Sequence, residues 1–488
     1  MDVQSVLQNY FHLKKLRPAQ ESVITSVLEK RDTVAILPTG AGKSLCYQVP
    51  AVLFPGITVV ISPLIALMYD QVTQLQTCGI RSVQLSSMLT ADQLSDELAA
   101  IRLGIYKIVY VSPERLQSTR ISAALRRCTI SLVVVDEAHC IATWGHEFRP
   151  HYRSLSLALH KLQQRPPILA VTATATKDTI ADICSTLELK NTNVISTPTN
   201  RENIRLQVIT VQNQEEQDCA LAYFAGCADA GQTLIFTATR NKAVEVKRSL
   251  QHWLPRLPPT AVFHAKLPAS EKMQIAADFR SGAVQVLIAT TAFGMGLNFP
   301  HIRRIIHAQI PGSYAQYSQE IGRAGRDGQP AECILLYLPQ DKTVQEVLQE
   351  SENQSDVRKK QRTRELDTFI QFCTQQKKCR KQELAEYFSS EQVAACGSCD
   401  VCRFRVAGIP SLAGQLGIPE ADCTKLKNQR TLLARATHCP ESSVAHDMQL
   451  LWLLAAKPSS QTNLEKLPAY GKGWIQRWAG QFLPAVVK

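Results

Sequence analysis

Two adjacent carboxylates, Asp136 and Glu137, come directly after an apolar run, Ser131 to Val135, that is rich in β-branched residues. Such a run is typical of a buried parallel strand, and the carboxyl ends of these strands are where open α/β sheets hold ligands. At that position Asp136 could bind a metal ion and Glu137 could orient a water molecule. The alternative is a strand that ends in a solvated acidic turn.

A glycine-rich loop upstream offers complementary chemistry. The strand-like run Thr33 to Leu37 leads into residues Pro38 to Ser44, and an apolar-periodic helix follows from Leu45. This order of strand, loop and helix is that of a phosphate-binding loop, although Leu37 stands where the strict pattern has its first glycine. Relaxed loops of this kind also occur by chance, so the loop alone leaves both interpretations open.

Each residue type within this loop has a distinct use. Gly40 and Gly42 let backbone N–H groups close around phosphate oxygens, and the following helix N-terminus adds its positive end. Lys43 could reach the outer phosphates, and Ser44 could offer its hydroxyl to magnesium. Together with the carboxylates after the other strand, the loop predicts a site for ATP and Mg²⁺.

A pair of arginines, Arg323 and Arg326, lies in the segment Gln319 to Gly328. Because they are three residues apart on a predicted helix, they point the same way and could reach nucleotide phosphates from a second domain. Such arginines stabilise transition-state charge only when two domains close on the nucleotide. A solvated basic helix is the alternative.

Four of the 15 cysteines have the spacing of a metal site, C-x16-C-x2-C-x2-C. Four thiolates without histidine predict a closed, tetrahedral zinc that holds structure, and an iron–sulfur cluster or coincidence are the alternatives. The other cysteines are scattered through apolar contexts, which fits a reducing compartment. The predicted zinc ligands are Cys379, Cys396, Cys399 and Cys402.

The composition favours a polyanionic partner. The 488 residues include 54 Lys and Arg against 42 Asp and Glu, a formal net charge of +12. A surplus of this size can also serve solubility alone. No apolar run approaches the roughly 18 residues of a membrane span, and the amino-terminal residues lack the apolar core of a secretion signal. We therefore expect a cytoplasmic protein with no membrane partner.

Strand-like and helical stretches alternate along the chain in two successive series, which predicts two tandem parallel sheets covered by helices. The polar stretch Glu350 to Glu365 predicts an exposed helix that leads into the cysteine region. The predicted strands are residues 33–37, 59–62, 108–111, 131–135 and 168–171 in the first series, and 233–236, 286–289, 304–307 and 334–337 in the second.

Taken together, these motifs resemble those of the RecQ DNA helicases of helicase superfamily two, in unbroken order over residues 5 to 405. Asp136 to His139 has the DEAH form of the family's metal and water motif. Further stretches also resemble family motifs: Leu16 to Gln20 for adenine, Ser62 to Gln71 and Ser112 to Leu116 for the DNA strand, Thr172 to Thr174 for coupling of hydrolysis to lobe closure, and Ala292 to Asn298 for nucleotide and DNA contacts of the second lobe.

The resemblance implies roles for individual residues. It places Gln20 at the adenine edge. The implied catalytic residues are Glu137, Asp136, Lys43, Arg326 and Arg323, and the implied nucleotide-binding residues are Gln20, Arg17, Thr39, Gly40, Gly42, Lys43, Ser44 and Asp136.

An aromatic-rich loop, Trp144 to Pro150, follows the DEAH motif and resembles the family's DNA-sensing loop. Trp144 and Phe148 offer flat faces for unpaired bases, and Arg149 offers a phosphate contact or a cation over a ring. The predicted DNA-binding residues of this loop are Trp144, His146, Phe148 and Arg149. A hydrophobic plug between sheet and helix is the alternative.

The sequence departs from the family pattern in three places. Leu13 stands where many members carry an aromatic for the base, and Phe299 where a lysine is common. We also expect the winged-helix domain of most members to be absent, because only 86 residues follow Cys402 and none of their segments is rich in strands. Residues 406–488 weakly resemble the helical HRDC module. From Arg403 onward this tail has 11 Lys and Arg and 5 Asp and Glu, a surplus of 11 − 5 = +6, so it could bind DNA or only pack as a cap.

We therefore expect an α/β protein with two RecA-like parallel-sheet domains at residues 1–204 and 205–342, a helical zinc-binding domain at 343–405 and a helical tail at 406–488. The resemblance implies an ATP-dependent 3′ to 5′ DNA helicase that acts on single-stranded and forked DNA in repair, recombination or replication, with ATP, Mg²⁺ and Zn²⁺ as cofactors. The alternatives are a translocase with little unwinding activity and an inactive DNA-binding scaffold. Protein partners and oligomeric state stay open.

Overall fold

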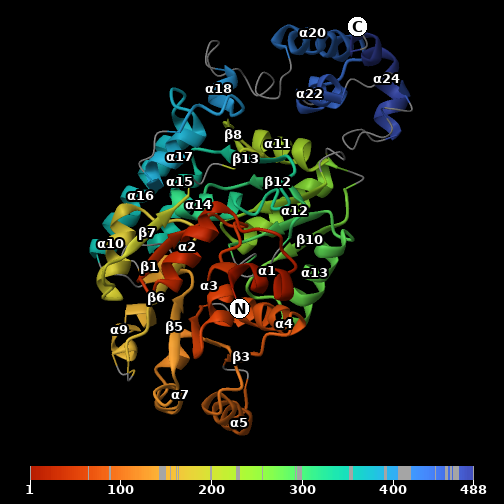
Figure 1. Cartoon of the computed structure of the whole chain (residues 1–488). Helices are drawn as coiled ribbons and strands as arrows, with labels where there is room; N and C mark the ends of the chain where they lie inside the picture. Colours follow the sequence, from red (N-terminus) through yellow and green to blue (C-terminus); the bar gives the residue numbers. More distant parts are fainter. Residues whose placement is uncertain are drawn as a thin grey trace.

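The structure is a computed structural model of the chain (Figure 1). It describes residues 2–63, 65–86, 89–141, 150–153, 155–160, 162, 164–197, 201–226, 231–254, 257–291, 293, 299–350, 356–389, 393–404, 419–445, 447–456, 460–461, 464 and 472–486.

The first lobe is built on a parallel sheet whose described strands have the order β3-β4-β2-β5-β6-β1-β7. Every residue of β1 and β2 is buried, as expected for strands that helices cover on both faces. The strands are β1 Thr33–Ile36, β2 Ile57–Ile61, β3 Ser82–Leu85, β4 Ile108–Val111, β5 Ile130–Val135, β6 Ile168–Thr172 and β7 Asn193–Ser196.

Helices flank this sheet, and several begin at a residue that caps the free N–H groups of the first turn. Thr90 and Thr176, for example, each accept a hydrogen bond from the backbone N–H three residues later. The helices are α1 Val3–Phe11, α2 Pro18–Leu28, α3 Leu45–Leu53, α4 Ile65–Thr77, α5 Ala91–Arg102, α6 Pro113–Leu116, α7 Thr119–Leu125, the 3-10 helix η1 Ala138–Ile141, α8 Pro150–Arg153, α9 Leu155–Leu159 and α10 Lys177–Thr186.

The second lobe has a smaller parallel sheet with the described strand order β10-β11-β9-β12-β13-β8. Its strands are β8 Ile204–Thr210, β9 Gln232–Phe236, β10 Thr260–Phe263, β11 Val286–Ala289, β12 Ile302–His307 and β13 Ala331–Tyr337. Its helices are α11 Gln214–Gly226, α12 Arg240–Trp253, α13 Ala269–Ser281 and α14 Tyr314–Ile321.

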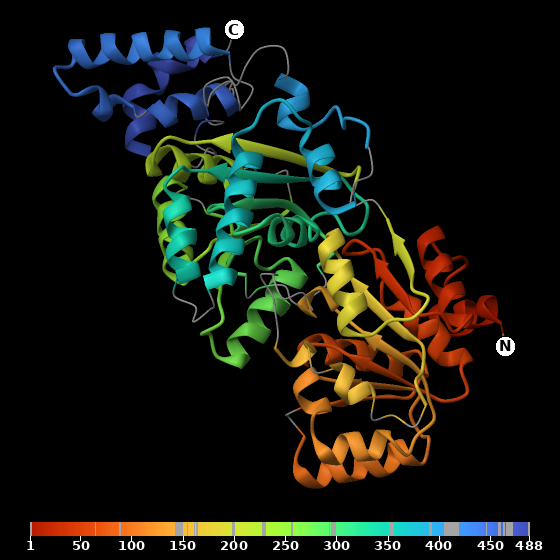
Figure 2. The same ribbon diagram turned by 90° about the vertical axis from the view of Figure 1, so that its left-hand side faces the viewer.

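The described part of the remaining chain is helical. In both ribbon views the second lobe lies between the first lobe and the tail (Figures 1 and 2). The helices after the second sheet are α15 Asp341–Glu350, α16 Asp356–Thr374, α17 Arg380–Ser389 and α18 Asp400–Phe404, followed in the tail by α20 Glu420–Ala436, α21 Glu441–Val444, α22 Asp447–Ala456 and α24 Lys472–Val486.

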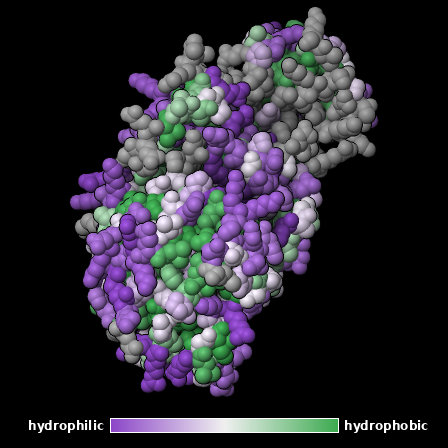
Figure 3. Space-filling view, in the orientation of Figure 1, coloured by the Kyte–Doolittle hydropathy of each residue, from purple (hydrophilic) through white to green (hydrophobic). Residues whose placement is uncertain are grey.

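The hydrophobic core consists of separate clusters for the first and the second lobe. Three clusters fill the first lobe, and two clusters cover the two faces of the second sheet. Alternate residues of β13 face opposite ways, so that Cys333 and Leu335 belong to the cluster that includes helices of the cysteine region, whereas Ile334 and Leu336 belong to the cluster that includes α11, α12 and the tail. Outside these cores, hydrophilic residues cover most of the face in Figure 3, and apolar residues reach the surface mainly near its middle. None of the helices described could cross a membrane.

The predicted strands all coincide with or overlap observed ones, and both sheets are parallel as expected. The helix predicted for residues 350–365 is confirmed from Asp356, and it continues to Thr374, with Leu366 and Phe369 buried in its second half. Residues 351–355 lie outside the described part of the chain.

Candidate nucleotide, zinc and DNA sites

The predicted ATP-site motifs meet at one edge of the first sheet. Strands β1, β6 and β5 are neighbours, and each ends in one of the motifs: the phosphate loop, the Thr172 to Thr174 segment and the DEAH segment. Backbone hydrogen bonds continue the sheet at these ends: Leu37 N, after β1, donates to Thr172 O of β6 at 3.0 Å, and Asp136 N, after β5, donates to Ile61 O of the neighbouring strand β2 at 2.8 Å. The sheet thus gathers residues that are far apart in the sequence.

The phosphate loop has the backbone form that its glycines favour. Gly40 and Gly42 have φ angles of 83° and 77°, in the left-handed region. Arg17 Nη1 donates to the carbonyl of Gly40 at 2.9 Å, and Gln20 Nε2 donates to that of Ala41 at 2.9 Å. Gln20 Oε1 accepts from Arg17 N at 2.9 Å. Gln20 therefore supports the loop in this structure, and its contact with adenine stays a prediction.

Asp136 is buried below the loop, with 8% of its surface exposed. Ser62 Oγ donates to Asp136 Oδ2 at 3.4 Å, and Tyr152 donates its hydroxyl to the backbone carbonyl of Asp136 at 2.9 Å. Burial raises the pKa of the Asp136 carboxyl to about 7, the neighbouring Glu137 adds to this effect, and the Lys43 ammonium opposes it. A divalent cation would stabilise the ionised form, so this buried carboxylate fits a magnesium ligand.

Glu137 connects to the adjacent strand through a histidine. Its Oε2 lies 3.4 Å from His139 Nδ1, which is 2.9 Å from the hydroxyl of Thr172. Thr172 Oγ1 in turn donates to the carbonyl of Thr174 at 3.0 Å. Glu137 also has a positive φ of 48°, a strained conformation for a residue with a side chain. This chain of contacts links the candidate water-orienting residue to the segment predicted to couple hydrolysis to closure.

The arginine segment of the second lobe packs against the phosphate loop. Gly322 approaches so closely that a methyl group there would lie 3.3 Å from Thr39 Cβ, and a methyl group on Gly40 would lie 3.7 Å from Arg326 Cγ. Burial, together with Arg323 and Arg201, lowers the pKa of Arg326 to about 9. This concentration of positive charge at the loop favours an anionic ligand.

Residues that we did not predict also belong to this site. Arg201 and Asn203 both donate to the carbonyl of Gly325, and Arg201 also donates to that of Gly322 at 3.3 Å. Their partners lie more than 120 positions away along the sequence. No spacing rule relates such distant residues, so the sequence carried no signal for them beyond their position before a strand.

The four predicted zinc ligands come together. The ligand atoms of Cys379, Cys396, Cys399 and Cys402 all lie within 4.8 Å of one another. The sulfurs of Cys379 and Cys399 are 3.9 Å apart, close to the roughly 3.8 Å expected for two thiolates on one tetrahedral zinc with Zn–S bonds of about 2.3 Å.

Hydrogen bonds also prepare these sulfurs for a cation. The backbone N–H groups of Cys396, Cys399 and Cys402 donate to neighbouring cysteine sulfurs at 3.3, 3.3 and 3.4 Å. Burial alone would raise the pKa of Cys396, but hydrogen bonds from Ser398 and Cys399 outweigh it and lower the pKa to about 6. The donor set and its geometry therefore fit zinc.

A buried ion pair joins the two cysteine segments. Arg380 follows Cys379 and is 0% exposed, and Asp400 follows Cys399. Arg380 Nη2 donates to Asp400 Oδ2 at 2.8 Å, and the guanidinium lies over the Phe372 ring at 5.1 Å. The pair ties the cysteine cluster to helix α16.

The predicted DNA-binding residues Trp144, His146, Phe148 and Arg149 lie outside the described residues, as does most of the Ala292 to Asn298 motif. The two single-residue departures from the family pattern, Leu13 and Phe299, lie among the described residues. Leu13 is 41% exposed, whereas Phe299 is buried and stacks on Phe293 with ring centroids 5.2 Å apart. Phe299 therefore serves the core of the second lobe.

Comparison with solved structures shows a two-lobed helicase fold. The Mycobacterium smegmatis helicase Lhr, in a structure bound to single-stranded DNA and AMP-PNP, aligns with a TM-score of 0.55 and 19% identity over 72% of this chain and 50% of its own. Three family models match: DEAD/DEAH box helicase over residues 17–183, helicase conserved C-terminal domain over 216–328 and RecQ zinc-binding over 339–403.

Curated relatives narrow the class. The ATP-dependent DNA helicase RecQ of Bacillus subtilis is 38% identical over 82% of this chain and 66% of its own length. The probable ATP-dependent DNA helicase RecS of the same organism is 38% identical over 72% of this chain and 70% of its own length. The chain belongs to the RecQ helicase family. It spans 61–66% of the length of the first three RecQ relatives, from Bacillus, Pasteurella and Haemophilus.

Proposed function

We propose that this protein is an ATP-dependent DNA helicase that moves 3′ to 5′ along single-stranded DNA and unwinds duplexes in DNA repair, recombination or replication. The main support is the meeting of the phosphate loop, the buried Asp136 and the arginine segment at one site between two lobes. The printed names of its relatives and its net charge of +12 agree with a DNA substrate.

Each residue has a role in the proposed hydrolysis. Lys43 and the backbone N–H groups of the loop hold the phosphates, and Ser44 with Asp136 would hold magnesium, which when bound neutralises charge on the phosphate oxygens. Glu137 orients a water molecule for attack on the terminal phosphate and takes its proton, while His139 fixes the carboxylate.

The arginines act from the other lobe. In the proposed mechanism Arg323 and Arg326 place positive charge beside the terminal phosphate when the lobes are closed, and they withdraw when the lobes open. Because lobe position and phosphate contact change together, each hydrolysis event can move the DNA-bound lobes relative to each other. Gln20 and Arg17 would release the loop carbonyls and turn to the adenine end of the nucleotide.

The remaining predicted residues bind DNA or stabilise the fold. We assign Trp144, Phe148 and Arg149 to stacking and phosphate contact with single-stranded DNA, and His146 to the same loop. The cysteine cluster would hold one structural zinc ion. We place the protein in the cytoplasm, on the chromosome.

Two measurements test the proposal. ATP hydrolysis is measured with and without single-stranded DNA, and unwinding is measured on a forked duplex. We expect hydrolysis to rise with DNA and the fork to be separated. An active ATPase that leaves the fork intact would instead indicate a translocase, and the absence of hydrolysis would indicate a DNA-binding scaffold.

A third measurement tests the aromatic loop. Replacing Trp144 and Phe148 by alanine should weaken DNA stimulation, because each stacked base contributes about 1–3 kcal/mol. Hydrolysis without DNA should stay at the wild-type level. Stimulation should also fall steeply with salt, since phosphate contacts dominate such binding. If DNA stimulates hydrolysis by the double variant as strongly as by wild type, the aromatic loop does not bind DNA as proposed.

A further inference from the structure

Arg201 stands where the chain enters the second lobe, between β7 of the first sheet and β8 of the second. Its guanidinium reaches the arginine segment, where it donates to the carbonyls of Gly322 and Gly325. Gly322 immediately precedes Arg323, and Gly325 immediately precedes Arg326 in the sequence. The position of both arginines is thus tied to a residue at the junction of the lobes.

Asn203 adds a second anchor from the same segment. Its Nδ2 donates to the carbonyls of Gly325 at 2.9 Å and Gln329 at 2.8 Å. Two side chains from one short stretch therefore hold the turn after α14 at several carbonyls. Carbonyls held this way cannot shift without breaking hydrogen bonds, so the turn is preorganised.

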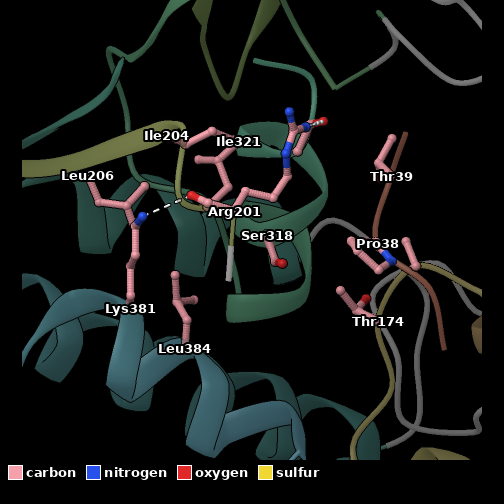
Figure 4. A pocket seen from close by; sticks show the side chains of 12 residues that line it. Pro38, Thr39, Thr174, Arg201, Ile204, Leu206, Ser318, Ile321, Lys381 and Leu384 are labelled. Atoms are coloured by element: carbon pink, nitrogen blue, oxygen red, sulfur yellow. Dashed lines mark hydrogen bonds between the residues drawn. The ribbon is translucent and has the colours of Figure 1, made fainter. Parts of the chain in front are cut away.

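The backbone of Arg201 is itself held by the zinc-binding region. Lys381 Nζ donates to the carbonyl of Arg201 at 2.8 Å (Figure 4). It also lies 3.5 Å from the carbonyl of Glu202. Lys381 belongs to α17 and is only 6% exposed. A buried ammonium needs such partners, because leaving it unsatisfied would cost free energy.

Three consecutive residues connect the cysteine cluster to the junction of the lobes. Cys379 is a predicted zinc ligand, Arg380 forms the buried pair with Asp400, and Lys381 binds the junction of the lobes. Because Cys379 directly precedes α17 and Arg380 and Lys381 are its first two residues, a change at the cysteine cluster would shift the start of α17 and with it the Lys381 ammonium.

A cavity marks the place where these parts meet (Figure 4). Thr39 and Thr174 line it from the first lobe, Ser318 from α14, and Lys381 from the zinc-binding region, with Arg201 between them. The phosphate loop, the coupling segment, the arginine segment and the zinc-binding region thus border one space.

We propose that Arg201 is a positioning residue for the arginine segment, and that Lys381 makes the zinc-binding region part of the ATP-hydrolysis apparatus by fixing Arg201. The inference rests on the proposed function, since it needs a chain that hydrolyses ATP. The zinc-binding region then contributes to hydrolysis through Lys381, in addition to holding its own fold.

The test compares full-length Lys381→Met, Lys381→Arg and Arg201→Gln with wild type. Zinc content, KM and kcat of the DNA-stimulated ATPase, and affinities for ADP and for ADP–aluminium fluoride are measured. Aluminium fluoride with ADP imitates the transition state, so misplaced arginines weaken its binding and leave that of ADP unchanged.

We expect Lys381→Met to keep its zinc and its KM and to lose about tenfold in kcat, with a matching loss of affinity for ADP–aluminium fluoride. Arg201→Gln should lose on the order of 100-fold, the size of effect that follows from a misplaced catalytic group. Lys381→Arg should recover most of the rate, because it can still donate to the Arg201 carbonyl.

Lys378→Met is the matched control. Lys378 lies three residues from Lys381, but its side chain is 42% exposed and pairs with Glu386, so its loss should leave kcat within about twofold of wild type. A wild-type kcat for zinc-loaded Lys381→Met, or a change confined to KM, would overturn the inference. If Lys381→Met does not fold, Asn203→Ala takes its place, and a wild-type kcat there would also overturn it. A wild-type protein without ATPase activity would overturn the proposed function as well.

Discussion

Asp136 and Glu137 are neighbours in the sequence, but their surroundings differ. Asp136 is buried beneath the phosphate loop, whereas Glu137 turns through a left-handed backbone toward His139. One carboxylate is therefore suited to hold a cation and the other to act on a water molecule. Loss of Glu137 should affect hydrolysis and spare nucleotide binding.

We predict that Glu137→Gln binds ATP as wild type does and lowers kcat by about 10²–10⁴-fold, the usual contribution of a general base. Lys43→Ala should instead weaken nucleotide binding, since it removes the phosphate contact. Nucleotide binding by fluorescence and steady-state ATPase rates separate the two effects. Hydrolysis by Glu137→Gln at the wild-type rate would show that another group orients the water.

Asp136 gives a prediction for pH. Its carboxyl has a pKa of about 7 in the folded protein against 3.8 in the unfolded chain. The folded protein therefore binds this proton more tightly, and stability at this site falls as pH rises from about 4 to about 7. Asp136→Asn does not titrate, so it should stabilise the protein more at pH 8 than at pH 5.5, with a difference of roughly 2 kcal/mol.

Thermal unfolding of both proteins in buffer without magnesium or nucleotide, at the two pH values, measures this difference. Added magnesium and nucleotide should stabilise wild type and not Asp136→Asn, because the variant lacks the charged ligand. A stability difference that does not change with pH would mean that Asp136 is ionised in the free protein.

At the scale of elements, the zinc-binding region depends on its cysteines. Helix α18 is short, so it has little core of its own and relies on the cluster and on the Arg380–Asp400 pair. We predict that Cys399→Ser loses bound zinc, measured by metal analysis, and that its thermal unfolding begins at a lower temperature. Cys128→Ser, which changes a thiol of the first lobe outside the cluster, should keep its zinc. Iron in the purified protein, or a stable variant without metal, would argue against structural zinc.

The sequence predicted central strands better than edge strands. Runs such as Leu132 to Val135 are buried on both faces and stand out as continuous apolar segments. The edge strands β3, β7 and β10 were not predicted, because each begins with a polar residue and β7 and β10 are partly exposed. Strand β8 carries alternating apolar residues from Ile204 and could have been found by that pattern.

The residues of the candidate site also fall into those that the sequence predicted and those that it did not. Motif residues were predicted because strand ends fix their place, and the phosphate loop and Asp136 do meet at one sheet edge. Arg201, Asn203 and Lys381 were missed, because their contacts join segments that approach only in the folded chain.

At the scale of the whole molecule, the hydrophobic clusters form two units. The first lobe is one unit, and the second lobe, the zinc-binding region and the tail together are the other. The first lobe has clusters of its own, whereas the second lobe shares one cluster with the zinc-binding region and another with the tail. The second unit includes Leu221 and Phe224 of α11, which pack in the same cluster as Leu453 of α22. Movement between lobes should therefore carry the zinc-binding region and the tail together with the second lobe.

This packing gives a prediction for the tail. A tail that only bound DNA could be deleted without harm to the rest of the protein, but removal of residues 406–488 uncovers apolar side chains on α11. We predict lower solubility and a loss of at least about 2 kcal/mol in stability, as expected when several buried side chains become exposed. Thermal unfolding, light scattering and DNA affinity of the truncated protein measure these effects. Wild-type stability of the truncated protein would assign the tail to DNA binding alone.

The same division of the core determines the order in which the two lobes can fold during synthesis of the chain. Every residue in the clusters of the first lobe precedes residue 196, so this lobe can complete its core before the second lobe has been synthesised. The second lobe cannot do so, because one of its clusters, which includes residues of α11, extends to Val486. During synthesis the apolar side chains of α11 that pack with the tail therefore stay exposed until the last part of the chain has been made. That interval is when a nascent chain of this protein is most exposed to misfolding and most in need of a chaperone.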